Sequence, residues 1–220
     1  MADTSSAGSS SDAATPPVPE FEEGDPVQKS KCRELVGGAL KTCAKVRFMR
    51  QALAALGRPV DNDAELVDCV HCPEGMDVAG GYIPSMKKVL LCQQWVTVEK
   101  EQVENTLTHE MIHAYDDARA HINWHDMTQH ACTEIRAANL SGDCTLAREL
   151  DRGNINPVRI GGAGARCVRR RAELSVAMAN GDANDKEIQA LARAAVERAW
   201  DSCYNDTAPF DEHSRSSNSF

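Results

Sequence analysis

Hydrophobic side chains recur at helical spacing in four stretches of the chain. Between residues 30 and 56 they return every three or four positions, which predicts one long helix that begins at Ser30 and ends before Gly57-Arg58-Pro59. The same spacing predicts a second helix from near Thr97 to about residue 120 and a third over residues 127–140. A last helix is expected after Asn184, which forms an N-terminal cap pair with Glu187.

Two short apolar runs, at residues 66–70 and 88–92, predict strands. Glycines and a proline between the two runs indicate turns. A flexible turn is also expected at Gly161-Gly162-Ala163-Gly164. It is not expected to be a phosphate-binding loop, because no Lys-Ser/Thr follows it. Helices that outnumber strands, without internal repeats, predict a single α+β domain.

Acidic charge is concentrated at the N-terminus. The 220-residue chain has a formal net charge of −9, and residues 1–28 contribute acidic side chains but no Lys or Arg. This stretch is also rich in Ser, Ala and Pro, and it resembles neither a secretory signal nor a matrix presequence. We therefore expect a disordered acidic tail over residues 1–28, a folded domain over residues 29–212 and a flexible C-terminal tail over residues 213–220.

Composition argues against two kinds of function. An acidic chain without a basic patch is not expected to bind nucleic acid directly. No uninterrupted apolar run approaches the roughly 18 residues of a membrane-spanning helix. Association with a membrane surface stays possible.

Nine cysteines are scattered along the chain. Only Cys69 and Cys72 have the spacing of a metal-binding pair, and because no second pair matches them a four-cysteine zinc site is not favoured. Two interpretations stay open. The cysteines are either reduced, partly buried thiols, or they form disulfides in an oxidising compartment, where an odd number leaves at least one thiol free in a monomer.

The strongest chemical signal is His-Glu-Met-Ile-His at residues 109–113, which fits the pattern His-Glu-x-x-His. His109 and His113 lie one helical turn apart, so both can bind one zinc ion. Glu110 projects beside them, where it can take a proton from water and return it to the leaving amine. The motif follows the predicted strand 88–92, which we expect at the cleft edge to pair with an extended substrate. The pattern predicts a zincin-like metalloprotease.

Zinc peptidases usually have three protein ligands and leave the fourth position for water. A metzincin would have a histidine six residues after His113, but Arg119 is there, which excludes that subclass. The next predicted helix carries His130 and Glu134 on one face, and we expect Glu134 to be the third ligand. The alternative third ligands are His130, His121 and His125.

Charged side chains near the motif allow more than one role. Asp116 and Asp117 follow His113 by three and four residues, so either can accept an imidazole N–H or simply be solvated. Residues 169–171 are three arginines, which are more typical of a solvated run than of a binding patch, although they could meet an anionic membrane surface.

A longer pattern around the motif resembles one protein family. The pattern comprises residues 109–117, Trp124, and residues 130–138, 140–144, 167–172, 201–206 and 209–210. Over roughly residues 30–212 the chain resembles the mitochondrial inner-membrane metalloproteases that assist ATP synthase assembly, whose animal members are also called Ku-binding proteins.

The resemblance implies a zinc endopeptidase held peripherally at the intermembrane-space face of the inner membrane. It further implies that the protein processes a membrane subunit of ATP synthase and helps it to assemble, and that its cysteines form disulfides after import. His109 and His113 carry over as metal ligands and Glu110 as the catalytic residue. The family pattern contains both His130 and Glu134, so it leaves the third ligand open.

Two other functions stay as alternatives. One is a non-proteolytic assembly chaperone that keeps the zinc site as structure, and a Glu110→Gln variant would distinguish it from a peptidase. The other is a Ku-associated DNA-repair factor, although the net charge of −9 counts against direct contact with DNA.

Overall fold

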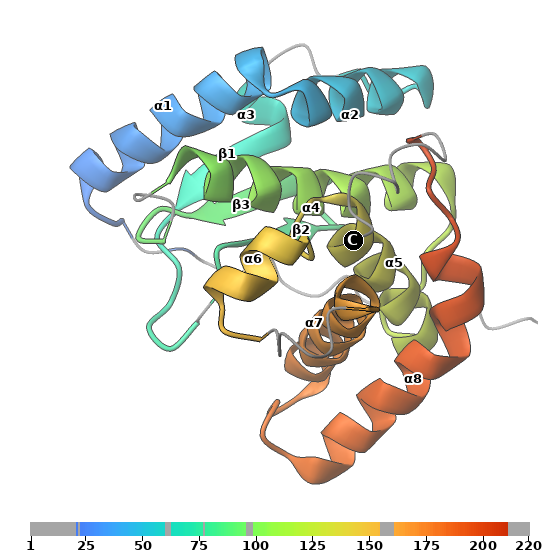
Figure 1. The fold of residues 1–220 in the computed structure, drawn as a ribbon. Coiled ribbons are helices and arrows are strands. Elements are labelled where there is room, and N and C mark those ends of the chain that lie inside the picture. Colours follow the sequence, from blue (N-terminus) through green and yellow to red (C-terminus); the bar gives the residue numbers. More distant parts are fainter. Residues whose placement is uncertain are drawn as a thin grey trace, which may run out of the picture.

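The computed structural model describes residues 21, 23–59, 63–76, 78–95, 99–154 and 161–210. These residues form an α+β fold that is mostly helical, as predicted, with one three-stranded sheet (Figure 1). In chain order the elements are α1 (Pro26–Thr42), α2 (Ala44–Ala55), α3 (Asp63–Leu66), β1 (Val67–Val70), β2 (Gly80–Ile83), β3 (Lys88–Cys92), α4 (Lys100–Arg119), α5 (Met127–Leu140), α6 (Leu146–Asp151), α7 (Ala163–Asn180) and α8 (Lys186–Tyr204).

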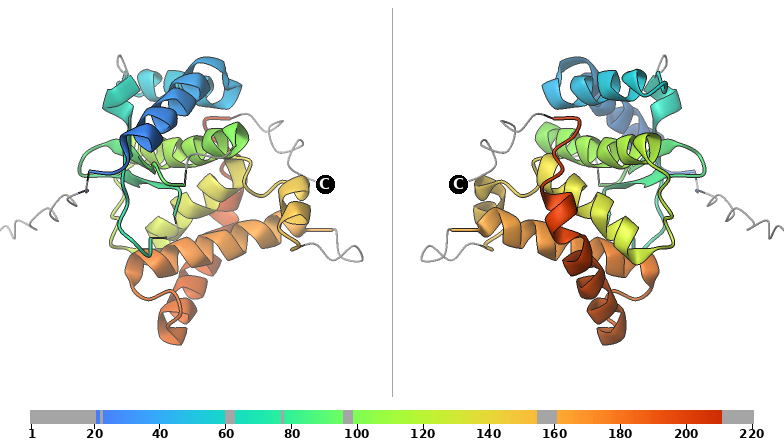
Figure 2. Two further views of the ribbon diagram at one scale, coloured as in Figure 1. Left: turned by 90° about the vertical axis from the view of Figure 1, so that its left-hand side faces the viewer. Right: turned by 90° about the vertical axis from the view of Figure 1, so that its right-hand side faces the viewer.

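The helices are arranged in layers (Figures 1 and 2). α1 and α2 form the upper layer, α4 and the sheet lie beneath them, and α7 and α8 form the lower layer. α4 packs against α1 and α2 on one side and against α5 on the other. One hydrophobic core fills the space between α1, α2, the sheet and α4, and a second lies between α5, α7 and α8. We call these parts the N-terminal half (α1–α4 with the sheet) and the C-terminal half (α5–α8).

The order of the strands in the sheet is β1-β3-β2. β3 pairs with β1 in parallel, aligning Val67 with Val89, and with β2 in antiparallel, aligning Gly80 with Leu91. The expectation that the strand at residues 88–92 forms the cleft edge is therefore wrong, because β3 is hydrogen-bonded on both sides. The edge strand next to α4 is β2, in a segment where the sequence predicted only turns.

The long helix predicted between residues 30 and 56 is two helices. The backbone of Cys43 is extended (φ −74°, ψ 120°), which ends α1 and begins α2. α1 also begins at Pro26 rather than Ser30, because the Asp25 side chain accepts the backbone N–H of Val27 at 3.0 Å. The first turn of α1 thus includes residues assigned to the tail, whereas residues 1–20 and 213–220 lie outside the described part.

α7 was not predicted from the sequence, and the start of α8 differs from its prediction. α7 begins inside the expected turn at residues 161–164, so the arginines of residues 169–171 lie on a helix. α8 is capped by Asp185 and not by Asn184, since the Asp185 carboxylate accepts the N–H groups of Glu187 and Ile188. α4 begins at Lys100, and its expected start at Thr97 lies outside the described residues.

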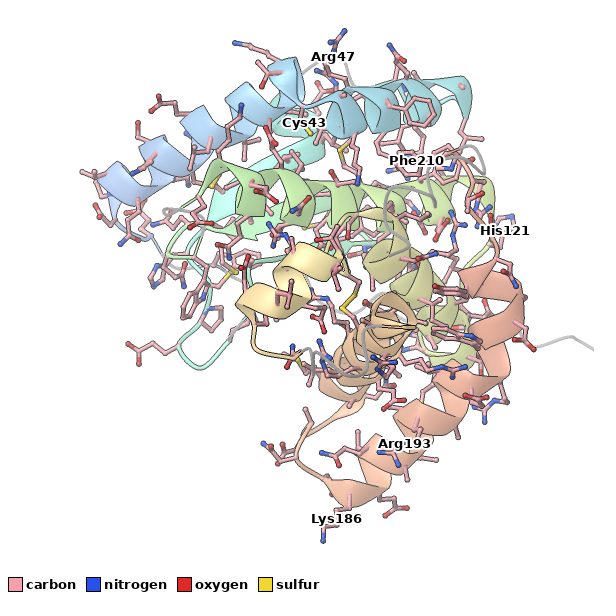
Figure 3. All side chains as sticks on the ribbon, in the orientation of Figure 1. Cys43, Arg47, His121, Lys186, Arg193 and Phe210 are labelled. Atoms are coloured by element: carbon pink, nitrogen blue, oxygen red, sulfur yellow. A yellow bond between two sulfur atoms is a disulfide. The ribbon has the colours of Figure 1, made fainter. Side chains whose placement is uncertain are left out.

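Disulfides account for eight of the nine cysteines. The pairs are Cys32–Cys69, Cys72–Cys92, Cys132–Cys203 and Cys144–Cys167. Cys43 is the free cysteine, and Figure 3 shows it where α1 meets α2. The interpretation with disulfides and one free thiol is confirmed. None of the described helices is both long enough and apolar enough to cross a membrane.

Candidate metal centre and active site

The site lies where the two halves of the molecule meet. α4 supplies His109, Glu110 and His113, and its buried neighbours Met111 and Ile112 anchor the helix in the core of the N-terminal half. α5 packs against α4 and faces it with buried polar side chains, among them Glu134. The Asp126 carboxylate fixes the start of α5 by accepting the N–H groups of the first turn.

The side chains of His109, His113 and Glu134 converge. Their ligand atoms all lie within 4.8 Å of one another. Each imidazole Nε2 lies 3.5 Å from a carboxylate oxygen of Glu134, which is longer than an ordinary hydrogen bond. Ligand atoms bound tetrahedrally at about 2.0–2.1 Å from a zinc-sized ion are about 3.3 Å apart. Two imidazoles and one carboxylate at this spacing therefore fit a metal ion.

Of the four expected candidates for the third ligand, the structure places Glu134 in the cluster. His130 is the next nearest, with its Nε2 3.3 Å from a Glu134 carboxylate oxygen, so it supports Glu134 from outside the cluster. His121 and His125 have exposed side chains. Figure 3 shows His121 at the outer edge of the molecule, beyond the end of α4.

The other ring nitrogens of the two motif histidines are held by separate acceptors. His109 Nδ1 is 3.1 Å from Asp143 Oδ2, and His113 Nδ1 is 2.8 Å from Thr133 Oγ1. With the Nδ1–H groups donated to these oxygens, both Nε2 atoms face Glu134 as ligands would. The Thr133 hydroxyl in turn donates to Asp116 Oδ2 at 3.0 Å. Asp116 thus supports His113 through Thr133, not directly.

Neither Asp143 nor Thr133 was singled out as a support of the site by the sequence. No local spacing connects them to the motif, and the signal that could have found them is the family pattern, which contains both. Asp117 has a different role: its carboxylate accepts hydrogen bonds from the Tyr82 hydroxyl and the Lys87 ammonium, both at 2.6 Å. It thereby fastens the hairpin of β2 and β3 to α4.

Arg136 closes this supporting network from behind. Its side chain is fully buried, and its Nε donates to both carboxylate oxygens of Asp116. Its other nitrogens bind the Asp206 carboxylate and the backbone oxygens of Asp206 and Ala208. The chain after α8 then reaches α2, where the rings of Phe48 and Phe210 lie 5.2 Å apart (Figure 3). The support of His113 is therefore continuous with the C-terminal segment, residues 205–210.

Protonation of the cluster is set by burial and by its carboxylates. Burial lowers the pKa of His113 to about 3, which leaves its imidazole neutral. Burial also opposes protonation of His109, but its hydrogen bond with Asp143 and the nearby Glu134 carboxylate outweigh it and raise the pKa of His109 to about 10. A cation bound at Nε2 would displace this proton, so metal affinity should fall as the pH falls.

Glu110 lies next to the cluster and lines the cleft. Its carboxylate is buried and accepts the backbone N–H of Tyr82. Without a bound cation, burial raises the pKa of Glu110 to about 7, and a nearby positive charge would lower it. A carboxylate in this position can accept a proton in one step and return it in the next.

The free edge of β2 runs beside Glu110. The backbone N–H of Cys92 donates to the backbone oxygen of Ala79. The backbone groups of Ala79, and of every second residue after it, therefore point towards β3. The backbones of Gly80 and Tyr82 consequently face away from β3, towards α4. Gly80 lines the same cleft as Glu110. This edge can therefore pair with an extended peptide placed across the cluster.

The cleft has a volume of about 460 Å³. His109 and Glu110 line it, together with exposed apolar side chains such as Trp95, Leu174 and Met178. The arrangement combines a metal-binding cluster, an adjacent carboxylate and an unpaired strand edge, which are the parts needed to hydrolyse a peptide bond.

Comparison with known proteins agrees with this chemistry. The model of the peptidase M76 family matches residues 30–211. The chain is 39% identical over 195 residues to the mitochondrial inner membrane protease ATP23 of Eremothecium gossypii, covering 84% of this chain and 75% of that protein. It is 40% identical over 185 residues to ATP23 of Saccharomyces cerevisiae strain Lalvin EC1118, covering 83% and 78%. For ATP23 of Candida glabrata the identity is 38% over 191 residues, covering 84% and 81%.

No solved structure matches the chain. The family match and the named relatives confirm the resemblance recognised in the sequence, and they identify the protein as a metallopeptidase. The chain belongs to the peptidase M76 family.

Proposed function

We propose that this metallopeptidase is a zinc-dependent endopeptidase in which His109, His113 and Glu134 bind the metal and Glu110 is the catalytic residue. The observation that carries the proposal is the convergence of the three ligand atoms within 4.8 Å of one another, beside the Glu110 carboxylate. Two imidazoles and one carboxylate are a ligand set that catalytic zinc uses in other peptidases. Imidazole nitrogen also favours zinc over magnesium or calcium.

Each residue has a distinct task in this proposal. When bound, zinc supplies a Lewis acid that acidifies water and polarises the scissile carbonyl. Glu110 accepts a proton from the attacking water at its carboxylate and then donates it to the leaving amine. The free edge of β2 orients the substrate by pairing with its backbone, because the backbone of Gly80 is not paired with β3 and Gly80 lines the cleft.

We further propose that the protein acts at the intermembrane-space side of the mitochondrial inner membrane as a peripheral protein. The relatives are named mitochondrial inner membrane proteases. Four disulfides suit a compartment in which oxidation is possible. The substrate we propose, from the family resemblance, is a membrane subunit of ATP synthase.

Replacing Glu110 with Gln tests the catalytic assignment. The variant loses the proton acceptor but keeps the size of the side chain, so peptide cleavage should fall by about 10²–10⁴-fold while metal content is unchanged. Cleavage of a peptide substrate and metal analysis of the same preparation measure the two properties. Glu104→Gln is the matched control, because Glu104 lies on α4 but its ion pair is with Lys100.

Two outcomes would contradict the peptidase proposal. Cleavage by Glu110→Gln at the rate of the unmodified protein would remove Glu110 from the mechanism. Full rescue of ATP synthase assembly by the same variant, in cells that lack the protein, would favour the assembly chaperone.

The third ligand is tested by comparing two substitutions on α5. Glu134→Gln removes a negatively charged ligand and should lower metal affinity by at least about tenfold, as for loss of other site groups. His130→Gln removes a side chain that contacts Glu134 from outside the cluster, and most of the affinity should remain. Competition with a chelator gives both affinities, and the reverse order would make His130 the ligand.

A further inference from the structure

One wall of the cleft is cationic, although the chain as a whole has a net charge of −9. Arg148 lies on α6, Arg152 follows that helix, and Arg171 lies on α7. All three line the cleft of about 460 Å³ that also contains His109 and Glu110. This wall, Arg148, Arg152 and Arg171, is called the arginine wall below.

The buried carboxylates behind the arginine wall do not balance its charge. Asp143 Oδ2 lies 3.1 Å from Arg171 Nη2, but it is also 3.1 Å from His109 Nδ1 and so is shared. Glu149 is likewise shared, because it accepts hydrogen bonds from Arg152 at 3.1 Å and from Arg170 at 2.9 Å. Arg148 and its neighbours therefore leave positive charge in the cleft.

Two guanidinium groups of the wall also have unused hydrogen-bond donors. The Nε atoms of Arg148 and Arg171 are buried and have no hydrogen-bond partner among the described residues. The ion pair of Arg148 is with Glu101 at 3.5 Å, and the Glu101 side chain is 75% exposed. Such a pair contributes little, because water competes for both charges. Buried N–H groups are normally satisfied, so neither guanidinium has its full set of hydrogen-bond partners among the described residues.

We propose that the arginine wall binds a carboxylate of the substrate, so that the enzyme prefers peptide segments with an acidic side chain close to the scissile bond. The inference rests on the peptidase function proposed above and adds the substrate class. The planar fork of a guanidinium matches a carboxylate with two parallel hydrogen bonds. The site is close to the reaction because Asp143 contacts both the His109 ring and Arg171.

The rest of the cleft indicates what surrounds the acidic side chain. Trp95, Leu174 and Met178 line it with side chains that are between 41% and 53% exposed. These surfaces gain most from apolar neighbours in the bound peptide. The preferred segment thus combines one acidic residue with apolar residues, and the free edge of β2 holds it extended.

The test compares pairs of peptides that differ by one charge. Fluorogenic peptides, acetylated and amidated at their ends, carry one Glu or one Gln at the same position, which is moved across the sequence. At one or more positions the Glu peptide should have a kcat/KM about tenfold to a hundredfold higher, mainly through KM, as expected for hydrogen bonds to a charged group. In Arg148→Gln the preference should fall towards one.

Arg148 is the residue to change because its side chain contacts Glu101 and not the metal-binding cluster. Substitution of Arg171 would also disturb Asp143, which orients His109. Arg33→Gln is the matched control: Arg33 makes an ion pair of the same length, 3.5 Å, with Asp68, outside the cleft. The preference for Glu should be unchanged in this variant.

Several results would overturn the inference. Equal kcat/KM values for all Glu and Gln pairs would do so, as would a preference that survives in Arg148→Gln. A preference for a free C-terminal carboxylate over an internal Glu, tested with non-amidated peptides, would assign the wall to chain ends instead of acidic side chains.

Binding separates this inference from the peptidase proposal. The same peptides are titrated against Glu110→Gln, with fluorescence anisotropy as the readout. Suppose that the unmodified protein cleaves no peptide, yet Glu peptides bind about tenfold more tightly than Gln peptides. If this advantage is lost in the Glu110→Gln/Arg148→Gln double variant, the arginine wall does bind a carboxylate. The peptidase proposal then fails while the inference about the arginine wall is upheld. Equal affinities for the Glu and Gln peptides would overturn the inference about the arginine wall, whether or not the protein cleaves them.

Discussion

At the scale of single residues, the two motif histidines are oriented by different acceptors. His109 faces the carboxylate of Asp143, whereas His113 faces the hydroxyl of Thr133. Burial disfavours ionisation of Asp143, but its hydrogen bond with His109 and the charge of Arg171 hold its pKa below the usual range. The position of Thr133 needs a group that accepts one hydrogen bond and donates another, which a hydroxyl does.

Thr133 offers a test with a matched control. Thr133→Val keeps the shape of the side chain but removes the acceptor for His113 and the donor to Asp116, so metal affinity should fall by about 10–100-fold. Thr133→Ser keeps the hydroxyl and should retain most of the affinity. Competition against a chelator of known affinity measures both. Equal losses in the two variants would mean that packing, and not the hydroxyl, matters.

The sequence predicts the residues of the site that lie on the motif helix or on the helix that follows it. His109, Glu110 and His113 were recognisable because helical spacing brings them together, and Glu134 because it follows on the next helix. Asp143 meets His109 across 34 positions of the chain, a contact that depends on how α5 packs against α4. Such tertiary contacts leave no periodic signal in a single sequence.

At the scale of elements, the edge strand β2 depends on a close approach of backbones. A Cβ atom at Gly80 would lie 2.6 Å from the Leu91 side chain and 2.7 Å from the backbone oxygen of Leu90. The next residue, Gly81, has open space at the same position. The two adjacent glycines thus have different roles, and the first of them allows β2 to lie against β3 beside the cleft.

This difference predicts that one alanine substitution destabilises the protein and that the other has little effect. Gly80→Ala should lower the free energy of unfolding by about 1–3 kcal/mol, because β2 must move away from β3. Cleavage should fall as well, since the displaced edge carries the backbone N–H that binds Glu110. Gly81→Ala should stay within about 1 kcal/mol of the unmodified protein. Urea unfolding followed by circular dichroism measures both, and equal effects would refute the packing argument.

The sequence failed to predict elements that are rich in small residues. The paired glycines of β2 have low strand propensity and suggest turns. The buried face of α7 consists largely of Cys and Ala, which give little hydrophobic contrast. The break between α1 and α2 at Cys43 has neither Gly nor Pro, the residues that usually indicate the end of a helix. By contrast, β3 has larger apolar side chains, and both β3 and α5 matched their predicted bounds.

At the scale of the whole molecule, each of the four disulfides lies within one half and none links the two halves. Cys32–Cys69 and Cys72–Cys92 lie within the N-terminal half, and Cys132–Cys203 and Cys144–Cys167 lie within the C-terminal half. The halves are therefore joined by packing of α4 on α5 and by the polar network of the site. A metal ion bound by residues of both α4 and α5 would add a further connection.

The disulfides predict how the stability of the two halves responds to their loss. Removing Cys132–Cys203, which spans 71 positions, should lower the free energy of unfolding by about 4 kcal/mol, and removing Cys72–Cys92, which spans 20, by about 3 kcal/mol, because a longer loop restricts the unfolded chain more. Urea titration of the paired Cys→Ala variants measures both losses.

A count of thiols provides the control. The denatured, unreduced protein should react with one equivalent of thiol reagent, at Cys43, and Cys43→Ser with none. After reduction the unmodified chain should expose nine thiols. A count well above one before reduction would contradict the pairing.

The position of Arg136 has a consequence for the order in which the enzyme is made. Arg136 joins the support of His113 to the C-terminal segment, which is among the last parts of the domain to leave the ribosome. Until that segment docks, the Asp116 carboxylate and the hydroxyl it holds lack their full set of partners. A nascent polypeptide therefore has the side chains of the cluster in its sequence before they have their full support.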